Sequence, residues 1–332
     1  MSKITSLVTG GAGFIGAHLS RELLQAGHHV VILDDLSGGF IENLPEQAEF
    51  VQGSITDADL ITSLFDKYQF DYVYHLAAYA AEGLSHFIRK FNYENNLIGS
   101  INLINESVKH KIKCFVFTSS IAVYGKGQLP MKEDLAPMPE DPYGISKLAV
   151  EMDLKCAHEM FGLNYIIFRP HNVYGEYQNI GDKYRNVVGI FMNQLMQDKS
   201  LSIFGDGSQT RAFSYIGDIA PVMAHCVNNR AAYNQVYNIG ADKEYTVKEL
   251  AETICNVMGK EGRLEFYEAR NEVLHAYSDH CKVESIFGVA QQTSLTEGLT
   301  KMAEWARMNG AKESQHFSKI EIEEKLPAFW KK

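Results

Sequence analysis

The sequence predicts an α/β fold in which a doubly wound parallel sheet carries a smaller mixed α/β lobe towards the C-terminus. A glycine-rich turn at 9–16 joins a short apolar strand to an amphipathic helix. Strand-like and helix-like segments then alternate as far as about residue 172, which requires a parallel sheet covered by helices on both faces. Beyond residue 172 the segments shorten and interleave less regularly. This change of rhythm indicates a second, smaller lobe.

The individual elements follow from the spacing of apolar residues. Short runs rich in Val, Ile, Phe and Tyr are typical of buried strands, and apolar residues at helical spacing are typical of amphipathic helices. The carboxyl ends of parallel strands meet at one edge, so their ligands are expected in one cleft there. In chain order we expect strands at 4–9, 29–33, 50–52, 72–76, 114–118 and 165–168, and helices at 14–26, 60–65, 93–110 and 143–161.

Composition excludes several classes of protein. The chain has 332 residues, 45% of them hydrophobic and 22% charged, as is ordinary for a soluble globular protein of one large or two modest domains. Its net charge is −10 without a long basic run, so we expect no nucleic-acid or membrane partner. No apolar run reaches 18 residues and no signal peptide is visible, which favours the cytoplasm. Five scattered cysteines form no Cys-x-x-Cys pair, so we expect packed, reduced thiols and no metal site.

The glycine turn predicts a bound diphosphate. Between a strand and a helix, such a turn brings backbone N–H groups and a helix N-terminus close to the phosphates. Gly10 permits the tight turn, Gly13 the close backbone approach, and Gly16 the packing of helix on sheet. A glycine pattern alone is also compatible with a flexible loop, but here both flanking elements are present. The sheet is therefore expected to be of the Rossmann type.

The second strand predicts which dinucleotide binds. It ends in Asp34 and Asp35, 24 residues after Gly10, where a carboxylate accepts hydrogen bonds from an adenosine ribose. A ribose phosphate would face two carboxylates there, with no Arg or Lys between Asp34 and Asn43. The sequence therefore predicts NAD in preference to NADP.

A second cluster predicts acid–base chemistry. Tyr143 and Lys147 are four residues apart at the start of a predicted helix, so they share one face. An ammonium about 4 Å from a phenolate contributes roughly 4 kcal/mol at an effective dielectric near 20, enough to carry a tyrosine pKa from about 10 towards 7. Chance alone gives about one Tyr-x-x-x-Lys in a chain with this many tyrosines. Its place one strand and one loop after Ser120 favours function, with Ser120 holding the reacting oxygen against Tyr143.

These motifs together resemble those of one family. In the first half they are Thr9–Gly16, Asp34, His75–Ala78, Asn96, Ser120 and the Tyr143/Lys147 pair; in the second they are Arg169–Gly175, Phe204–Arg211, Arg270–Val273 and Ser294–Leu299. The chain resembles the extended short-chain dehydrogenase/reductases, in their branch of NAD-dependent nucleotide-sugar epimerases and dehydratases, and especially the UDP-glucose 4-epimerases. The likeness extends over nearly the whole chain.

The resemblance implies a role for each motif. Lys147 is expected to contact the nicotinamide ribose, Glu272 the nucleoside ribose, and two arginines the phosphates. Without the motif, a surface ion pair would explain either arginine equally well. The implied catalytic residues are Ser120, Tyr143 and Lys147. The implied NAD contacts are Gly10, Gly13, Phe14, Ile15, Gly16, Asp34, Asp35, Ser54, Ile55, Leu76, Ala77, Ala78, Asn96, Ser119, Tyr143, Lys147 and His171. The implied substrate contacts are Ser120, Asn172, Asn186, Val187, Arg211, Arg270, Glu272 and Ala276.

The residues near Tyr124 favour one reaction within the family. Its dehydratases carry an Asp-Glu pair there and its uronate decarboxylases a Glu, whereas this chain has Ile121 and Ala122. No second acid or base is offered for chemistry at C3 or C5. We therefore expect a 4-epimerase acting through a transient 4-keto sugar. The alternatives are a nucleotide-sugar reductase or dehydrogenase, a UDP-uronate 4-epimerase, and a non-catalytic NAD-binding regulator.

Two positions bear on the sugar. Uronate epimerases of this branch tend to have Thr where this chain has Asn172, so Asn172 favours a neutral hexose. Epimerases restricted to small sugars have a bulky aromatic residue at the position of Ala276. We therefore expect UDP-glucose and UDP-galactose as substrates, with tolerance of UDP-N-acetylhexosamines.

The resemblance also implies an organisation of the chain. We expect an NAD-binding domain at 1–172, to which a strand and helix return from about 212–240, and a nucleotide-sugar lobe mainly at 173–309. The tail at 310–332 is polar apart from its apolar end, which either docks or stays disordered. The helices at 93–110 and 143–161 are expected to pair with a second copy as a four-helix bundle, which gives a homodimer.

Overall fold

The computed structural model describes residues 3–269, 273–288, 292–314 and 317–331, and it confirms the α/β prediction. Seven strands form one parallel sheet in the order β11-β6-β5-β4-β1-β2-β3. The connections run in opposite directions on the two sides of the β1/β4 boundary, and ligands of such sheets bind beyond the carboxyl ends at this point. The strands are β1 (Thr5–Thr9), β2 (His29–Asp34), β3 (Glu49–Gln52), β4 (Tyr72–His75), β5 (Cys114–Thr118), β6 (Tyr165–Pro170) and β11 (Gln235–Ile239).

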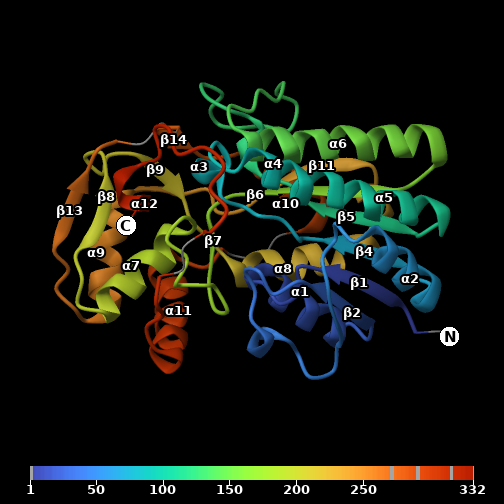
Figure 1. Ribbon diagram of the computed structural model, residues 1–332, viewed down its shortest axis with the longest axis horizontal. Coiled ribbons are helices and arrows are strands. Elements are labelled where there is room, and N and C mark those ends of the chain that lie inside the picture. The colour runs from blue at the N-terminus through green and yellow to red at the C-terminus, as the bar shows by residue number, and fades with distance from the viewer. Residues whose placement is uncertain (1–2, 270–272, 289–291, 315–316, 332) are drawn as a thin grey trace.

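Helices cover both faces of this sheet (Figure 1). On one face α1, α8 and α10 share an apolar core with Val8, Val30 and Ile32. On the other, α2, α5 and α6 pack against Leu7 and Val31. Successive strand residues thus point to opposite faces, as the pleat requires. The helices are α1 (Phe14–Gln25), α2 (Ala58–Tyr68), α4 (Arg89–Tyr93), α5 (Gly99–Lys109), α6 (Pro142–Phe161), α8 (Ile216–His225) and α10 (Cys281–Phe287).

The helix expected at 93–110 differs most from the prediction. It is preceded by α4 and interrupted by a π-helical turn at Glu94–Ile98 before α5 begins. At this turn the buried Asn96 amide accepts from the Tyr79 N–H at 2.7 Å and donates to the Tyr79 carbonyl at 3.1 Å. π turns of this kind often lie at functional sites. Periodicity of apolar residues carries no signal for them.

The second lobe is built from short elements around its own core. Figure 1 shows it beside the carboxyl edge of the large sheet. Both α8 and β11 return to the large sheet as expected, and α10 also packs there through Val283, which the sequence did not indicate. The remaining elements are α3 (Glu82–Ser85), β7 (Val173–Tyr174), α7 (Val187–Met196), β8 (Leu201–Phe204), β9 (Thr210–Ala212), β10 (Ser214–Tyr215), β12 (Glu244–Thr246), α9 (Val247–Met258), β13 (Leu264–Tyr267), β14 (His275–Ala276), α11 (Leu295–Asn309) and α12 (Ala328–Lys331).

The C-terminal segment docks onto the protein. Leu326 and Trp330 are buried against Ala81, Leu84 and Ile88, which lie in and around α3. The Glu321 carboxylate also accepts hydrogen bonds from the N–H groups of Lys90 and Phe91, each at 2.8 Å, and so caps the first turn of α4. Of the two outcomes that the sequence left open for the end of the tail, docking is observed.

The cysteine prediction is partly wrong. All five are free thiols, but Cys156 and Cys281 are exposed, whereas Cys114 and Cys226 are buried and Cys255 is half-buried. Cys156 lies on the outer side of α6, so apolar neighbours in sequence do not ensure burial on a helix. Among the described residues no helix is long and apolar enough to span a bilayer.

Candidate active site

A cavity of about 520 Å3 opens where the chain leaves the carboxyl ends of the large sheet. Residues that follow β1, β2, β3, β4, β5 and β6 line it, together with residues of the second lobe. Six separate loops therefore converge on one space, as the parallel topology predicts.

The glycine turn forms a cradle with no room for side chains. Gly10 has φ +73°, and a Cβ there would lie 2.8 Å from the Ala77 backbone nitrogen. A Cβ on Gly16 would overlap the Gly10 carbonyl oxygen, and one on Gly13 would lie 3.1 Å from it. Gly13 is the N-cap of α1 and has no side chain to bond the first N–H groups of that helix. The cradle thus fits a diphosphate, and we assign it to that of NAD.

Asp34 lies at the end of β2 with its carboxylate pinned by backbone groups. One oxygen accepts from the Ala12 N–H at 3.0 Å and the other from the Leu36 N–H at 2.8 Å. Burial raises the pKa of this carboxyl above its ordinary value, although these hydrogen bonds oppose the shift. Each oxygen keeps a second lone pair, so a ribose with two hydroxyl donors fits here.

The three expected catalytic residues all line this cavity. Ser120 follows β5, and its hydroxyl lies near enough to the Tyr143 phenol to lower the pKa of that phenol. Tyr143 lies in the first turn of α6, where the Asp141 carboxylate caps the Gly144 N–H at 2.9 Å. Lys147 lies one turn further on and donates from Nζ to the Thr118 carbonyl at 2.8 Å.

The predicted lowering of the Tyr143 pKa by Lys147 is wrong when only the protein's own groups act on the phenol. Burial is the largest influence on the phenol and raises its pKa, while the nearby Ser120 hydroxyl opposes it only in part. The Lys147 Nζ lies 5.8 Å from the centroid of the Tyr143 ring, and burial lowers its own pKa to about 7. Burial disfavours the charged form of this amine, so Lys147 lowers the Tyr143 pKa less than its spacing in sequence suggests.

A buried ion pair supports the floor of the site. The Arg169 Nε donates to a Glu151 carboxylate oxygen at 2.9 Å, and the Ser119 hydroxyl donates to the same oxygen. Arg169 also lies over the Tyr124 ring, with its guanidinium carbon 4.7 Å from the centroid. Ser119, expected to touch NAD, thus lines the cavity while its hydroxyl is engaged with Glu151. Glu151 lies four residues after Lys147 on the same helix, a spacing from which it could have been found.

Most of the other expected NAD contacts also line the cavity. Asn96 does not, because its amide holds the backbone of Tyr79, which itself lines the wall. The residues found in the lining are Phe14, Ile15, Asp35, Ser54, Ile55, Leu76, Ala77, Ala78 and His171.

The expected substrate residues gather at the side facing the second lobe. Asn172 and Arg211 both line the cavity, and Asn172 donates to the Ala212 carbonyl at 3.2 Å. Arg211 donates to the carbonyls of Thr210, Val273 and Leu274 and so braces the segment before Ala276. Asn186 and Ala276 line the main cavity, Val187 lines a neighbouring one of about 200 Å3, and Arg270 and Glu272 lie outside the described residues.

Sequence reasoning missed a cation over the cavity. Arg185 lines the wall, pairs with Asp182 and lies over the Tyr79 ring at 4.8 Å. Its guanidinium also approaches Gly38, where a Cβ would lie 3.3 Å from it. Arg185 lies 147 residues beyond Gly38 in sequence, so the residues between 34 and 43 give no sign of this cation.

The absence of a second acid or base for chemistry at C3 or C5 stays a prediction, but two ionisable residues that the sequence did not indicate line the same cavity. Glu82 and His86 line the cavity, and the charge of Glu82 acts on Tyr143. Both come from the loop and short helix after β4, which carry no recognisable acid–base motif. Ile121 and Ala122 do line the cavity as expected, so that part of the wall is apolar.

Comparison with known proteins agrees with this geometry. Residues 6–240 match the model of the NAD dependent epimerase/dehydratase family. The chain belongs to this family. It is similar to a putative UDP-glucose 4-epimerase of Methanocaldococcus jannaschii, with 37% identity over 91% of this chain and 98% of the relative. The isomerase class and the NAD cofactor follow from the family and its relatives.

Two solved epimerases share the fold closely. One is the UDP-glucose 4-epimerase of Thermotoga maritima with UDP-glucose, at a TM-score of 0.88 and 33% identity, covering 92% of this chain and 99% of that one. The other is a UDP-N-acetylglucosamine 4-epimerase of Methanobrevibacter ruminantium with UDP-N-acetylmuramic acid, at a TM-score of 0.85 and 31% identity, covering 92% and 98%.

In this epimerase-family member the C-terminal segment forms part of the wall. Trp330 lines the main cavity, and Phe329 lines the neighbouring one, where it packs against Phe204 and Tyr267. We predict that Trp330→Ala weakens nucleotide-sugar binding by about tenfold, because a buried aromatic wall is lost. Calorimetric titration measures this affinity. Phe161→Ala, which truncates an exposed aromatic residue outside the lining, is the matched control; equal affinity of both variants would contradict the prediction.

Proposed function

We propose that the enzyme is an NAD-dependent 4-epimerase of UDP-hexoses. The observation that carries this proposal is the cluster of Ser120, Tyr143 and Lys147 beside the apolar Ile121 and Ala122. The cluster provides one proton-transfer site, and 4-epimerisation requires only one. The dehydratases and decarboxylases of the family carry acidic residues at this part of the wall. In this chain Ile121 and Ala122 occupy these positions, and neither has a carboxylate.

The chain's own residues move one proton at the sugar. Tyr143 takes the proton of the 4-hydroxyl while Ser120 holds that oxygen by a second hydrogen bond. Bound NAD supplies a hydride acceptor and a positive ring charge that favours the phenolate, which burial otherwise disfavours. Lys147, anchored on the Thr118 carbonyl, adds to this charge. The 4-keto sugar then rotates within the cavity. Tyr143 returns the proton, and the opposite epimer leaves.

The lining supports UDP-glucose, UDP-galactose and UDP-N-acetylhexosamines as substrates. Ala276 packs in a cluster with Ile121, Val123 and Met131 and lines the cavity with a single methyl group. We assign the space beside this methyl group to the substituent at C2. We assign Arg211 and Asn186 to the diphosphate, with Arg185 beside them. Arg270 and Glu272 stay predictions for the phosphates and the nucleoside ribose.

Incubation of the purified enzyme with a panel of UDP-, dTDP- and GDP-sugars, followed by separation of the products, tests the proposal. We expect interconversion of glucose and galactose epimers of UDP-sugars with no net consumption of added NAD, because the hydride returns within each turnover. Stoichiometric use of NAD would favour the alternative, a reductase or dehydrogenase. Turnover confined to UDP-uronates would favour a uronate 4-epimerase.

We further propose a homodimer through α5 and α6, which lie side by side on one outer face (Figure 1). Ile98, Ile145 and Met152 are large apolar residues that are exposed there by 53%, 41% and 62%. Burial of such a face against a second copy would form a four-helix bundle. Sedimentation at the mass of two chains is expected, and sedimentation as a monomer would contradict it. The cytoplasmic location stays a prediction from sequence.

A further inference from the structure

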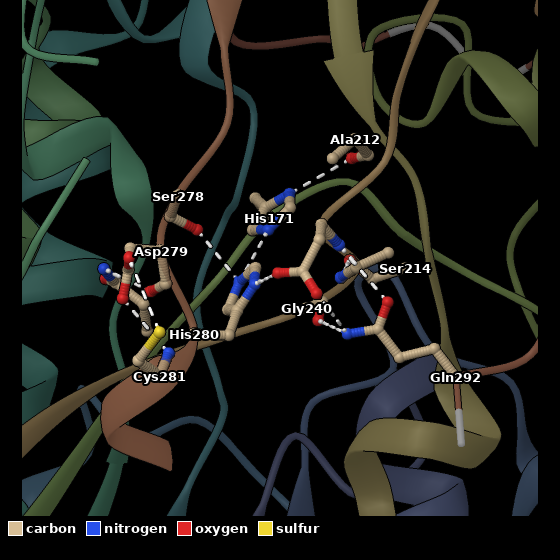
Figure 2. A network of polar contacts seen from close by, with 12 residues as sticks. His171, Ala212, Ser214, Gly240, Ser278, Asp279, His280, Cys281 and Gln292 are labelled. Atoms are coloured by element: carbon tan, nitrogen blue, oxygen red, sulfur yellow. Dashed lines mark hydrogen bonds and ion pairs between the residues drawn. The ribbon is translucent and has the colours of Figure 1, made fainter. Parts of the chain in front are cut away.

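Two buried histidines from distant parts of the chain meet beside the cavity. His171 directly follows β6 and lines the cavity, and His280 is the N-cap of α10. Their rings stack with centroids 5.2 Å apart, and their Nε2 atoms lie 3.1 Å from each other (Figure 2). Only 3% of His171 and 2% of His280 are exposed, so water cannot readily replace this contact.

The partners of the two rings determine how many protons the pair holds. His171 Nδ1 faces the Ala212 carbonyl at 3.1 Å, and His280 Nδ1 faces the Asp242 carboxylate at 2.6 Å. Both partners only accept, so both Nδ1 atoms carry a proton. The facing Nε2 atoms need one proton between them, because two lone pairs repel and two protons collide. This arrangement of acceptors fits a pair that holds three ring protons.

The charged partner of the pair lies on the His280 side. Asp242 is the carboxylate in contact with the pair, and its pKa lies below the ordinary value chiefly because of its hydrogen bond to His280. Burial lowers the pKa of His171 to about 3. The neutral Ser278 hydroxyl lies 3.0 Å from His280 Nε2, and Gln292 donates to Asp242 at 3.0 Å. The nearby carboxylates have other partners or positions: Asp218 accepts from Thr293 and Asp279 from Cys281, while Glu284 lines a small cavity beside His280.

The pair joins the large sheet to the second lobe. His171 follows β6 of the sheet and Asp242 follows β11, while the Ala212 carbonyl belongs to β9 of the lobe. Ala212 follows Arg211, the residue assigned to the substrate's diphosphate. A Cβ on Gly240 would lie 2.6 Å from the Ser214 hydroxyl and would overlap His171 Nε2, so the backbone also packs closely on the pair. Movement of His171 would thus displace the strand that carries Arg211.

We propose that His171 and His280 share one proton, and that this protonated pair, held by Asp242, clasps β9 to the sheet and positions Arg211 for the nucleotide sugar. His171, His280 and Asp242 are positioning residues here. As the pH rises and the shared proton leaves, two lone pairs face each other and the clasp loosens. The affinity for the nucleotide then falls. This proposal rests on the proposed function only in the role given to Arg211.

Binding of UDP to the NAD-loaded holoenzyme tests the clasp. Calorimetry across a pH series is expected to show a Kd that rises at alkaline pH in the wild type. In Asp242→Asn this rise should move down by about one pH unit or more, because the neighbouring negative charge is lost. Asp242 is 59% exposed at its side chain, so this variant should fold. Asp279→Asn, which removes a nearby carboxylate that accepts from Cys281, is the matched control and should keep the wild-type profile.

Two variants of His280 separate the effect of protonation on UDP binding from the effect of packing. The amide of His280→Gln donates to His171 without titrating, so its Kd for UDP should stay flat across the series. His280→Leu lacks any donor, and its Kd should be raised about fivefold at every pH. If Asp242→Asn and Asp279→Asn share one profile, or if both His280 variants keep the wild-type rise, the proposed positioning role is overturned.

A spectroscopic measurement tests the shared proton independently of any substrate. In holoenzyme labelled with 15N-histidine, NMR should show one imidazolium-like ring at neutral pH that disappears in His280→Gln. Two neutral rings in the wild type would overturn the shared proton. If the enzyme proves to act on another class of nucleotide sugar, the proposed function fails while this signature persists, so the two failures are distinguishable.

Discussion

Replacement of Tyr143 by Phe should abolish epimerisation while NAD stays bound. In the proposed mechanism the phenol takes and returns the substrate proton, and a positioned acid–base group of this kind contributes about 10²- to 10⁴-fold to the rate. The phenylalanine ring keeps the packing of the first turn of α6. We therefore expect kcat to fall by about that factor, as measured by conversion of UDP-galactose to UDP-glucose. The NAD content of the purified variant should match that of the wild type.

Tyr124→Phe is the matched control for this experiment. Tyr124 is also buried, and its hydroxyl donates to Asn238 at 2.8 Å outside the cavity lining. Loss of that bond should lower the free energy of unfolding by about 1–3 kcal/mol and leave kcat near the wild-type value. A Tyr143→Phe enzyme that retains full turnover would exclude Tyr143 as the acid–base group and would favour the non-catalytic NAD-binding alternative.

Replacement of Ala276 by Tyr should remove turnover of N-acetylated sugars selectively. Ala276 is 6% exposed, and it pairs with Arg211 in the small sheet of the second lobe. Ile121 and Met131 pack beside Ala276, so a tyrosine ring at position 276 would point into the cavity. We expect kcat/KM for UDP-N-acetylglucosamine to fall by about 100-fold or more, and that for UDP-galactose to change by less than about threefold.

The conservative variant Ala276→Ser keeps a small side chain and should retain both activities. Equal loss on both sugars in Ala276→Tyr would refute steric selection, because overpacking of the site would then explain the result. Direct competition between the two substrates in one reaction measures the ratio of their kcat/KM values without a correction for the fraction of active enzyme.

The order of neighbouring residues in the sequence was sufficient to predict the large sheet and one edge of the site. The strand, glycine turn and helix at 5–25 follow one another directly, so their contacts with a dinucleotide can be read from spacing. The same holds for Tyr143 and Lys147, which share a helix face four residues apart. Three other features have no such signal in the sequence: the hydrogen bonds of Asn96 to the Tyr79 backbone, the exposure of Cys156 and the interruption of the long helix. They depend on which residues from elsewhere pack against each segment.

The energetics of the site needed the tertiary structure. Spacing alone placed an ammonium beside a phenol and suggested a lowered tyrosine pKa, but burial acts on both groups and raises the pKa of the phenol. Arg185 reaches Gly38, and His171 meets His280, across 147 and 109 residues. Residue order was thus enough to predict the cofactor and to propose Ser120, Tyr143 and Lys147 as the catalytic residues, because strand-to-helix turns form from neighbours. Folding decided the charges around them and the closure of the cavity by Trp330, because desolvation and contact are properties of the packed chain.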